Sequence, residues 1–256
     1  MEIKNVVYSH DHKVNHVNQV NIQIDPGKIT TIIGPNGCGK STLLGVMANN
    51  FVPQKGEVML DGKGLTMYKP KELARKVAVV HQENSAPADM TVERLVSYGR
   101  LPYKSMFKAD KEADDTAVEW ALNETNLSEW KYVTIDALSG GQRQRVWIAM
   151  SLAQQTPYLF LDEPTTYLDI YYQYEILELI KRLNKEHGLT IVMVLHDINQ
   201  AIRYSDAIIA MKTGEIMVKG HPKEIITNEL IHDIYGVDVL VKEDEMTGLY
   251  TIPVGI

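Results

Sequence analysis

The chain has 256 residues, 45% of them hydrophobic and 23% charged, which is the composition of an ordinary globular protein. Its formal net charge of −7 argues against a general binder of nucleic acids or anionic membranes, because such proteins carry an excess of lysine and arginine. A single cysteine excludes an intrachain disulfide and a cysteine-based zinc site, and no membrane-length apolar run or signal-peptide pattern occurs, so we expect a soluble cytoplasmic protein.

Short apolar runs predict β-strands in the first and last parts of the chain. They cover residues 22–24, 29–33, 58–60, 77–80, 158–161, 191–195, 207–211 and 215–218. Several are continuously apolar, which is typical of parallel strands covered on both faces. Pro26-Gly27 and Asp61-Gly62 predict hairpin-like turns.

Helical patterns lie between these runs. Ile176, Leu179, Ile180 and Leu183 form one helical stripe, and Asp169 precedes them as a suitable N-terminal residue. The alternation of strands and helices favours an α/β fold with a largely parallel sheet.

The middle and the end of the chain depart from this alternation. Residues 86–136 show little strand signal and repeated helical spacing, which predicts an inserted helical subdomain with a solvated acidic face. Residues 221–256 combine a helical stretch with a short β-like tail.

A glycine-rich segment carries the first chemical signal. The sequence GPNGCGKST at residues 34–42 matches G-x-x-x-x-G-K-[ST] and stands between the predicted strand 29–33 and a helix that begins near Ser41. Glycines let backbone N–H groups wrap around phosphates, and the helix N-terminus adds a positive dipole. Lys40 can reach the β- and γ-phosphates of a nucleotide, and the Ser41 hydroxyl can bind Mg²⁺.

A second strand, predicted at 158–161, ends in two carboxylates. Beside a phosphate loop, such a strand would carry Asp162 to the Mg²⁺, often through a water molecule. Glu163, one residue further, would face the attacking water, where a carboxylate can act as general base.

A third segment, LSGGQ at residues 138–142, precedes that strand. Ser139 and two glycines lead into a helix that begins near Gln142, which predicts another anion-binding helix N-terminus.

Together these residues resemble the ATP-binding-cassette (ABC) family over nearly the whole chain, in the family's order. The similar motifs are Walker A at 34–42, the Q-loop glutamine at Gln82, the signature motif at 138–142, Walker B at 159–163, the D-loop at 167–169 and the switch histidine at His196.

The resemblance implies a single ABC ATPase domain over residues 1–256 with the phosphate-loop NTPase fold. Its nucleotide-binding core would comprise 1–85 and 137–220, with a mainly parallel sheet and an N-terminal antiparallel β subdomain. Residues 86–136 would form the helical subdomain, and residues 221–256 a C-terminal extension.

It also implies hydrolysis of ATP, with Mg²⁺, between two copies of the chain arranged head to tail. Nucleotide contacts would come from Gly34, Asn36, Gly37, Cys38, Gly39, Lys40, Ser41 and Thr42 of one copy and from Ser139, Gly140, Gly141 and Gln142 of the other. The catalytic set would be Glu163, His196, Gln82, Lys40 and Asp169. Mg²⁺ would be held by Ser41, Gln82 and Asp162. Such a site acts by electrostatic positioning more than by covalent chemistry.

The family usually stacks adenine on an aromatic residue near the N-terminus, which makes Tyr8 the candidate platform. Tyr8 lies slightly early for the usual spacing, so His10 or His12 could stack instead. Because His10, His12 and His16 lack a cysteine or carboxylate at a fixed spacing, we interpret them as a solvated loop rather than a metal site. Cys38 is interpreted as a small filler rather than a redox switch.

Three further segments, 96–103, 145–150 and 236–239, resemble cassettes of bacterial importers for chelated iron, haem and cobalamin. This implies ATP-driven uptake of iron(III)–siderophore complexes, with haem or cobalamin as alternative cargo. The chain would lie at the cytoplasmic face of the cell membrane on two transmembrane permease subunits, with a cleft around residues 82–103 receiving one of their helices. A separate extracytoplasmic protein would bind the cargo, and no nucleic acid is expected as a partner.

Two other classes of protein are open alternatives. A cassette of a non-transport machine, for DNA repair or iron–sulfur assembly, normally carries long coiled coils or zinc modules, and this sequence contains neither pattern. The second alternative is a different phosphate-loop enzyme, a GTPase or kinase. A GTPase should contain N-K-x-D after a strand, whereas residues 184–187 read NKEH at the end of a predicted helix.

Overall fold

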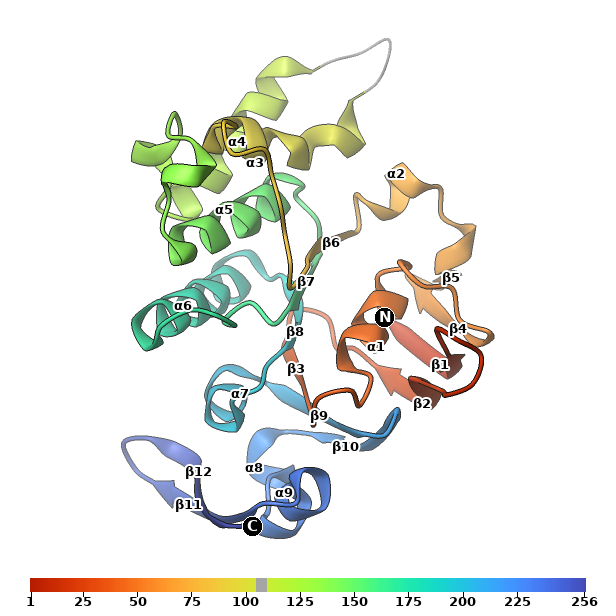
Figure 1. Cartoon of the computed structure of the whole chain (residues 1–256). Helices are drawn as coiled ribbons and strands as arrows, with labels where there is room; N and C mark the ends of the chain where they lie inside the picture. Colours follow the sequence, from red (N-terminus) through yellow and green to blue (C-terminus); the bar gives the residue numbers. More distant parts are fainter. Residues whose placement is uncertain (105–109) are drawn as a thin grey trace. The chain divides into compact units, whose positions relative to one another are not determined.

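The computed structural model describes residues 1–104 and 110–256, so residues 105–109 of the predicted helical subdomain lie outside the described parts (Figure 1). The chain forms two compact units. The first unit combines Met1–Met67 with Thr190–Ile256, and the second is Tyr68–Leu189.

The first unit contains an antiparallel sheet with the strand order β2-β1-β4-β5 (Figure 1). Its strands are β1 (Glu2–Tyr8), β2 (Val17–Gln23), β4 (Lys55–Leu60) and β5 (Lys63–Gly64). The apolar-run pattern misses β1, because irregular pairing with β2 breaks the alternation of buried and exposed residues along it. Asp61-Gly62 joins the antiparallel pair β4 and β5, which confirms that turn.

The other turn prediction is wrong. Pro26-Gly27 follows β2 but leads into β3 (Ile29–Ile33), which belongs to a different sheet. All five residues of β3 are buried, so this strand has no face to offer to water and is placed between two parallel neighbours. The turn therefore redirects the chain between sheets instead of closing a hairpin.

The second sheet region of the first unit is mainly parallel. β3 pairs in parallel with β8 (Thr190–Val194) on one side and β9 (Ala207–Lys212) on the other, and β10 (Glu215–Gly220) adds antiparallel to β9. Every residue of β8 is buried, as the continuous apolar runs predicted. The helices of this unit are α1 (Lys40–Met47), α7 (Ile198–Tyr204), α8 (Pro222–Ile225) and α9 (Asn228–Tyr235), with a 3₁₀ turn at Leu65–Met67. The chain ends in an antiparallel hairpin of β11 (Asp238–Asp244) and β12 (Gly248–Gly255).

The second unit pairs β6 (Val77–Val80) in parallel with β7 (Tyr158–Asp162). Its helices are α2 (Pro70–Leu73), α3 (Val92–Ser97), α4 (Lys111–Glu124), α5 (Gly140–Ala153) and α6 (Ile170–His187), with 3₁₀ helices at Tyr98–Tyr103, Ser128–Trp130 and Ile135–Ala137. α3, α4 and α5 pack against one another. The predicted stripe of α6, from Ile176 to Leu183, is buried.

The predicted fold class is confirmed: an α/β protein with parallel strands, an antiparallel β subdomain and a helical insertion. Over residues 1–104 and 110–256, no helix is both long enough and apolar enough to span a bilayer.

Candidate nucleotide site

The phosphate loop of the first unit connects β3 to α1, as its motif requires. Gly34 and Gly39 both adopt positive φ angles, of 151° and 103°. A side chain at Gly34 would collide with the backbone oxygen of Met211 and the sulfur of Cys38, and one at Gly39 with the backbone oxygen of His16. Because only glycine tolerates both the conformation and the contacts, these positions keep the loop backbone free to face a ligand.

Lys40, the first residue of α1, is only 4% exposed. Its Nζ donates to the backbone oxygens of Gly34 at 2.8 Å and Pro35 at 3.1 Å. No carboxylate of the described residues forms an ion pair with this ammonium group. A buried cation that is bonded only to neutral carbonyls favours an anion at the loop.

Two further groups pack against this loop. Cys38 is buried, and burial raises the pKa of its thiol, which keeps it protonated and supports the filler interpretation. The Tyr235 hydroxyl at the end of α9 is buried near Gly34 without a hydrogen bond of normal geometry, and burial raises the pKa of Tyr235 to about 12. Sequence reasoning did not find Tyr235, because nothing in its local pattern predicts a contact with Gly34, 201 positions earlier in the chain.

His196 lies at the same sheet edge as the phosphate loop. In the parallel pair β3 and β8, Ile32 is the partner of Val194. Gly34 lies two residues after Ile32, and the exposed His196 lies two residues after Val194. The phosphate loop and His196 therefore follow the same ends of two adjacent strands.

The aromatic residues near the N-terminus form one cluster beside α1. The Tyr8 ring stacks on Phe51, with ring centroids 5.2 Å apart and planes 22° apart. The Tyr8 hydroxyl lies 3.2 Å from His10 Nδ1, and His10 Nε2 lies 3.4 Å from the hydroxyl of Thr42 in the phosphate loop motif. His10 is exposed, whereas Tyr8 is half-buried, and His12 is an exposed residue of the same loop.

The second unit brings Gln82 and Glu163 together. Val80 of β6 is the partner of Leu161 of β7. Gln82 lies two residues after Val80, and Glu163 lies two residues after Leu161. Gln82 Nε2 donates to Glu163 Oε2 at 2.7 Å, and the Thr166 hydroxyl donates to the same oxygen at 3.0 Å. The two donors orient the carboxylate, and Thr166 is a site residue that the motif search missed.

The backbone of Glu163 is strained, with a φ of 51° in a residue other than glycine. Such left-handed conformations cost of order 1 kcal/mol or more and concentrate at functional sites. The turn after β7 holds it, because the backbone N–H of Thr166 donates to the Glu163 oxygen at 3.2 Å. Asp162, the last residue of β7, is half-buried next to it.

Ser139 is the N-cap of α5, which begins at Gly140, two residues earlier than predicted. Ser139 Oγ accepts from the backbone N–H of Gln142 at 3.3 Å, and Gln142 Oε1 accepts from the backbone N–H of Ser139 at 2.9 Å. This capping box explains the early start of the helix. A side chain at Gly141 would collide with the ring of Tyr172 on α6, so this glycine allows close packing of the two helix N-termini.

Asp169 is the N-cap of α6, as predicted: its Oδ1 accepts from the backbone N–H of Tyr172 at 3.2 Å. In the segment 96–103, Arg100 is buried and donates to Asp114 and to the backbone oxygen of Ala153, each at 2.8 Å. This arginine ties the 3₁₀ helix to α4 and α5 and is a structural element of the helical insertion.

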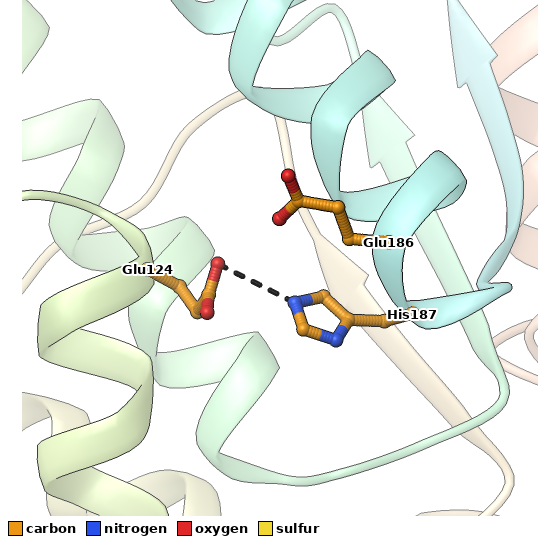
Figure 2. Close-up of side chains that lie close together, drawn as sticks. All are labelled: Glu124, Glu186 and His187. Carbon is orange, nitrogen blue, oxygen red and sulfur yellow. Dashed lines mark ion pairs between the residues drawn. The ribbon is translucent and has the colours of Figure 1, made fainter.

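Glu124, Glu186 and His187 gather where α4 and α6 end, with ligand atoms within 4.8 Å of one another (Figure 2). His187 Nε2 lies 3.4 Å from Glu124 Oε2, which also accepts from Arg182 Nη1 at 2.7 Å. Arg182 Nη1 lies 3.4 Å from Glu186 as well. The guanidinium therefore already supplies the positive charge between the two carboxylates, and we interpret the cluster as an ion-pair bridge between helices and not as a metal centre.

The comparisons with known proteins agree with the motifs. The family model described as ABC transporter matches residues 17–166. The chain belongs to the ABC transporter family. The predicted ATPase activity of this ABC cassette is thereby confirmed.

Two relatives of this ABC cassette match over most of their length. It is 48% identical to the iron(3+)-hydroxamate import ATP-binding protein FhuC of Bacillus subtilis, over 90% of this chain and 86% of that protein. It is 44% identical to the petrobactin import ATP-binding protein FpuC of Bacillus anthracis, over 93% of this chain and 88% of that protein.

Solved structures show the same fold. An ABC transporter in an inward-facing conformation matches with a TM-score of 0.85 and 25% identity, over 100% of this chain and 96% of that chain. A dimeric ATP-binding cassette in a post-hydrolysis state with ADP and phosphate matches with a TM-score of 0.74 and 32% identity, over 86% of this chain and 98% of that chain.

Proposed function

We propose that this cassette is the ATPase subunit of a bacterial importer for iron(III)–siderophore complexes. The assignment of the cargo rests on two relatives, named for import of iron(3+)-hydroxamate and of petrobactin, which match this cassette at 48% and 44% identity. Haem and cobalamin are the alternative cargoes, since the same subgroup of cassettes resembles this chain at residues 96–103.

In this proposal the first unit binds the triphosphate. The backbone N–H groups of residues 34–42 surround the phosphates, and Lys40 turns its buried ammonium from the loop carbonyls to the β- and γ-phosphates. His196 contacts the terminal phosphate and holds its geometry. The buried, unpaired charge of Lys40 is the feature of this unit that supports the assignment.

The second unit supplies the groups that act on water. Glu163 polarises the attacking water as general base, with its carboxylate oriented by Gln82 and Thr166. Asp162 and Gln82 of this unit offer carboxylate and amide oxygens, and Ser41 of the first unit offers a hydroxyl oxygen, the donor types that Mg²⁺ prefers. When bound, Mg²⁺ supplies positive charge that stabilises the charge developing on the phosphates.

Two copies of the cassette complete each site. Residues 139–142 of one copy would donate hydrogen bonds to the γ-phosphate of an ATP held by the other, and Asp169 would lie near the contact between the copies. The dimeric state of a similar cassette with ADP and phosphate supports this arrangement.

Two positions compete for the adenine platform. Tyr8 was the first candidate, but its ring is already stacked on Phe51. His10 is exposed and reaches Thr42, so we propose that His10 presents the stacking face and that Tyr8 supports it from behind. A His10→Ala variant should bind ATP more weakly than a His12→Ala variant, and equal affinities would contradict this order.

The proposed partners are two transmembrane permease subunits, at the cytoplasmic face of the cell membrane, and indirectly an extracytoplasmic binding protein; no nucleic acid is involved. The cargo would never touch this chain. Residues 82–103 would receive a helix of the permease, and the cassette would act as a single domain with 86–136 as its helical subdomain and 221–256 as its extension.

Uptake of isotope-labelled iron tests the proposal. Cells that lack this chain should fail to take up at least one iron(III) chelate from a panel of hydroxamate and catecholate siderophores. The wild-type chain should restore uptake, and Glu163→Gln should not. Restoration of haem or cobalamin uptake, with iron uptake unaffected throughout, would refute the iron assignment while leaving the ATPase assignment intact.

A further inference from the structure

The side chain of Asn199 joins the C-terminal hairpin to α7. Asn199, in the first turn of α7, exchanges hydrogen bonds with Thr251 of β12 in both directions. The backbone N–H of Thr251 donates to Asn199 Oδ1 at 2.7 Å, and Asn199 Nδ2 donates to the Thr251 backbone oxygen at 3.1 Å. The Thr251 hydroxyl donates to the same Oδ1 at 3.1 Å.

This contact has the pattern of a strand pairing, with an amide side chain in place of a neighbouring backbone. Thr251 is 6% exposed whereas Asn199 is exposed, so these bonds are partly shielded from competing water. The hairpin also packs on α9 through β11, which gives it a second support (Figure 1). Asn199 therefore anchors α7 to the C-terminal hairpin, which itself packs on α9.

His196 lies between two anchors. Leu195, just before it, donates its backbone N–H to the Ile32 oxygen at 3.3 Å and so belongs to the sheet. Asp197, just after it, caps α7 by accepting from the Gln200 N–H at 2.8 Å. Because a single residue separates His196 from α7 and consecutive Cα atoms are only about 3.8 Å apart, the backbone of His196 is closely coupled to the start of α7.

We propose that Asn199 is a positioning residue for hydrolysis: by holding α7 on the C-terminal hairpin, it sets the place of His196 relative to the terminal phosphate. This inference rests on the proposed role of His196. It gives the C-terminal segment a function in turnover, namely that displacement of the hairpin would slow hydrolysis without weakening the binding of ATP.

The test is a double-mutant cycle in the full-length protein. Asn199→Ala should lower kcat by on the order of tenfold, since small misplacements of a site group have effects of this size or larger, while the dissociation constant for ATP is unchanged. In a His196→Ala background, measured by single-turnover hydrolysis, Asn199→Ala should cause no further loss.

Matched variants separate positioning from simple loss of stability. Ile252→Ser changes the next residue of β12, whose side chain points away from Thr251 and is partly exposed, and should leave kcat unchanged. If Asn199→Ala does not fold, Asn199→Asp keeps the two bonds to Oδ1 but sets a carboxylate oxygen against the Thr251 backbone oxygen, and should also lower kcat in the wild-type background only.

Equal losses from the Asn199 variants in both backgrounds would overturn the inference, because they would show that the contact acts independently of His196. Full turnover by His196→Ala alone would refute the proposed role of His196 and this inference with it.

Discussion

The carboxylate of Glu163 offers the sharpest test of the site. Glu163→Gln keeps the size of the side chain and an oxygen that can accept from Gln82 and Thr166, but removes the charge and the basicity. A positioned general base contributes about 10²–10⁴-fold to a rate, so kcat should fall by that factor while ATP still binds. The variant should accumulate as an ATP-bound dimer.

The structure adds a second, graded perturbation. Thr166→Val removes the hydroxyl that donates to Glu163 Oε2 at 3.0 Å while nearly preserving shape. A hydrogen bond to a charged group contributes about 1.5–3 kcal/mol, so its loss should lower kcat by about tenfold to a hundredfold, less than the loss of the base itself.

The assay is steady-state phosphate release, with size-exclusion chromatography for the dimer. Thr156→Val is the matched control, because its buried hydroxyl donates to the Tyr158 oxygen at 2.8 Å elsewhere in the second unit. It should cost stability and leave kcat unchanged. Brisk turnover by Glu163→Gln would refute its assignment as base, and equal effects of Thr166→Val and Thr156→Val would refute the orienting role of Thr166.

The remaining predictions concern the first unit and the signature. Lys40→Ala should raise the ATP dissociation constant by about tenfold or more, as expected for a lost charged hydrogen bond, and an unchanged constant by isothermal titration would contradict the phosphate-loop assignment. Ser139→Arg should spare ATP binding yet stop turnover, whereas Ser139→Asn, which keeps an N-cap acceptor, should retain the helix; full activity of the arginine variant would exclude completion of the site by a second copy. Tyr235→Phe removes a buried hydroxyl without a normal hydrogen bond and should raise the free energy of unfolding by about 1 kcal/mol. Because the pKa of Tyr235 is raised from 10.0 to about 12 in the folded protein, only the unfolded state releases this proton between those values. The wild type therefore loses stability as pH rises through that window and Tyr235→Phe should lose less, which denaturant titrations at neutral and alkaline pH can check.

Local rules account for much of the fold. The strands β3 and β8 were predictable because each is buried on both faces and therefore reads as a continuous apolar run. β1 was not, because its irregular pairing removes the alternation that such rules detect. Pro26-Gly27 signals a change of direction, but only the burial requirement of the next strand decides which sheet receives it.

The site divides in the same way. The order of the amino acids alone predicted the phosphate loop, the strand-end carboxylates and the helix-starting Asp169, since a glycine-rich run before a lysine, a carboxylate after an apolar run and an aspartate before a helical stripe each leave a local pattern. The capping role of Ser139 was visible only in the structure. Thr166, Asn199 and Tyr235 acquired their roles only in the folded chain. Their partners are defined by packing between distant segments, as with Asn199 and Thr251, 52 residues apart, and no short-range pattern encodes which buried groups will meet.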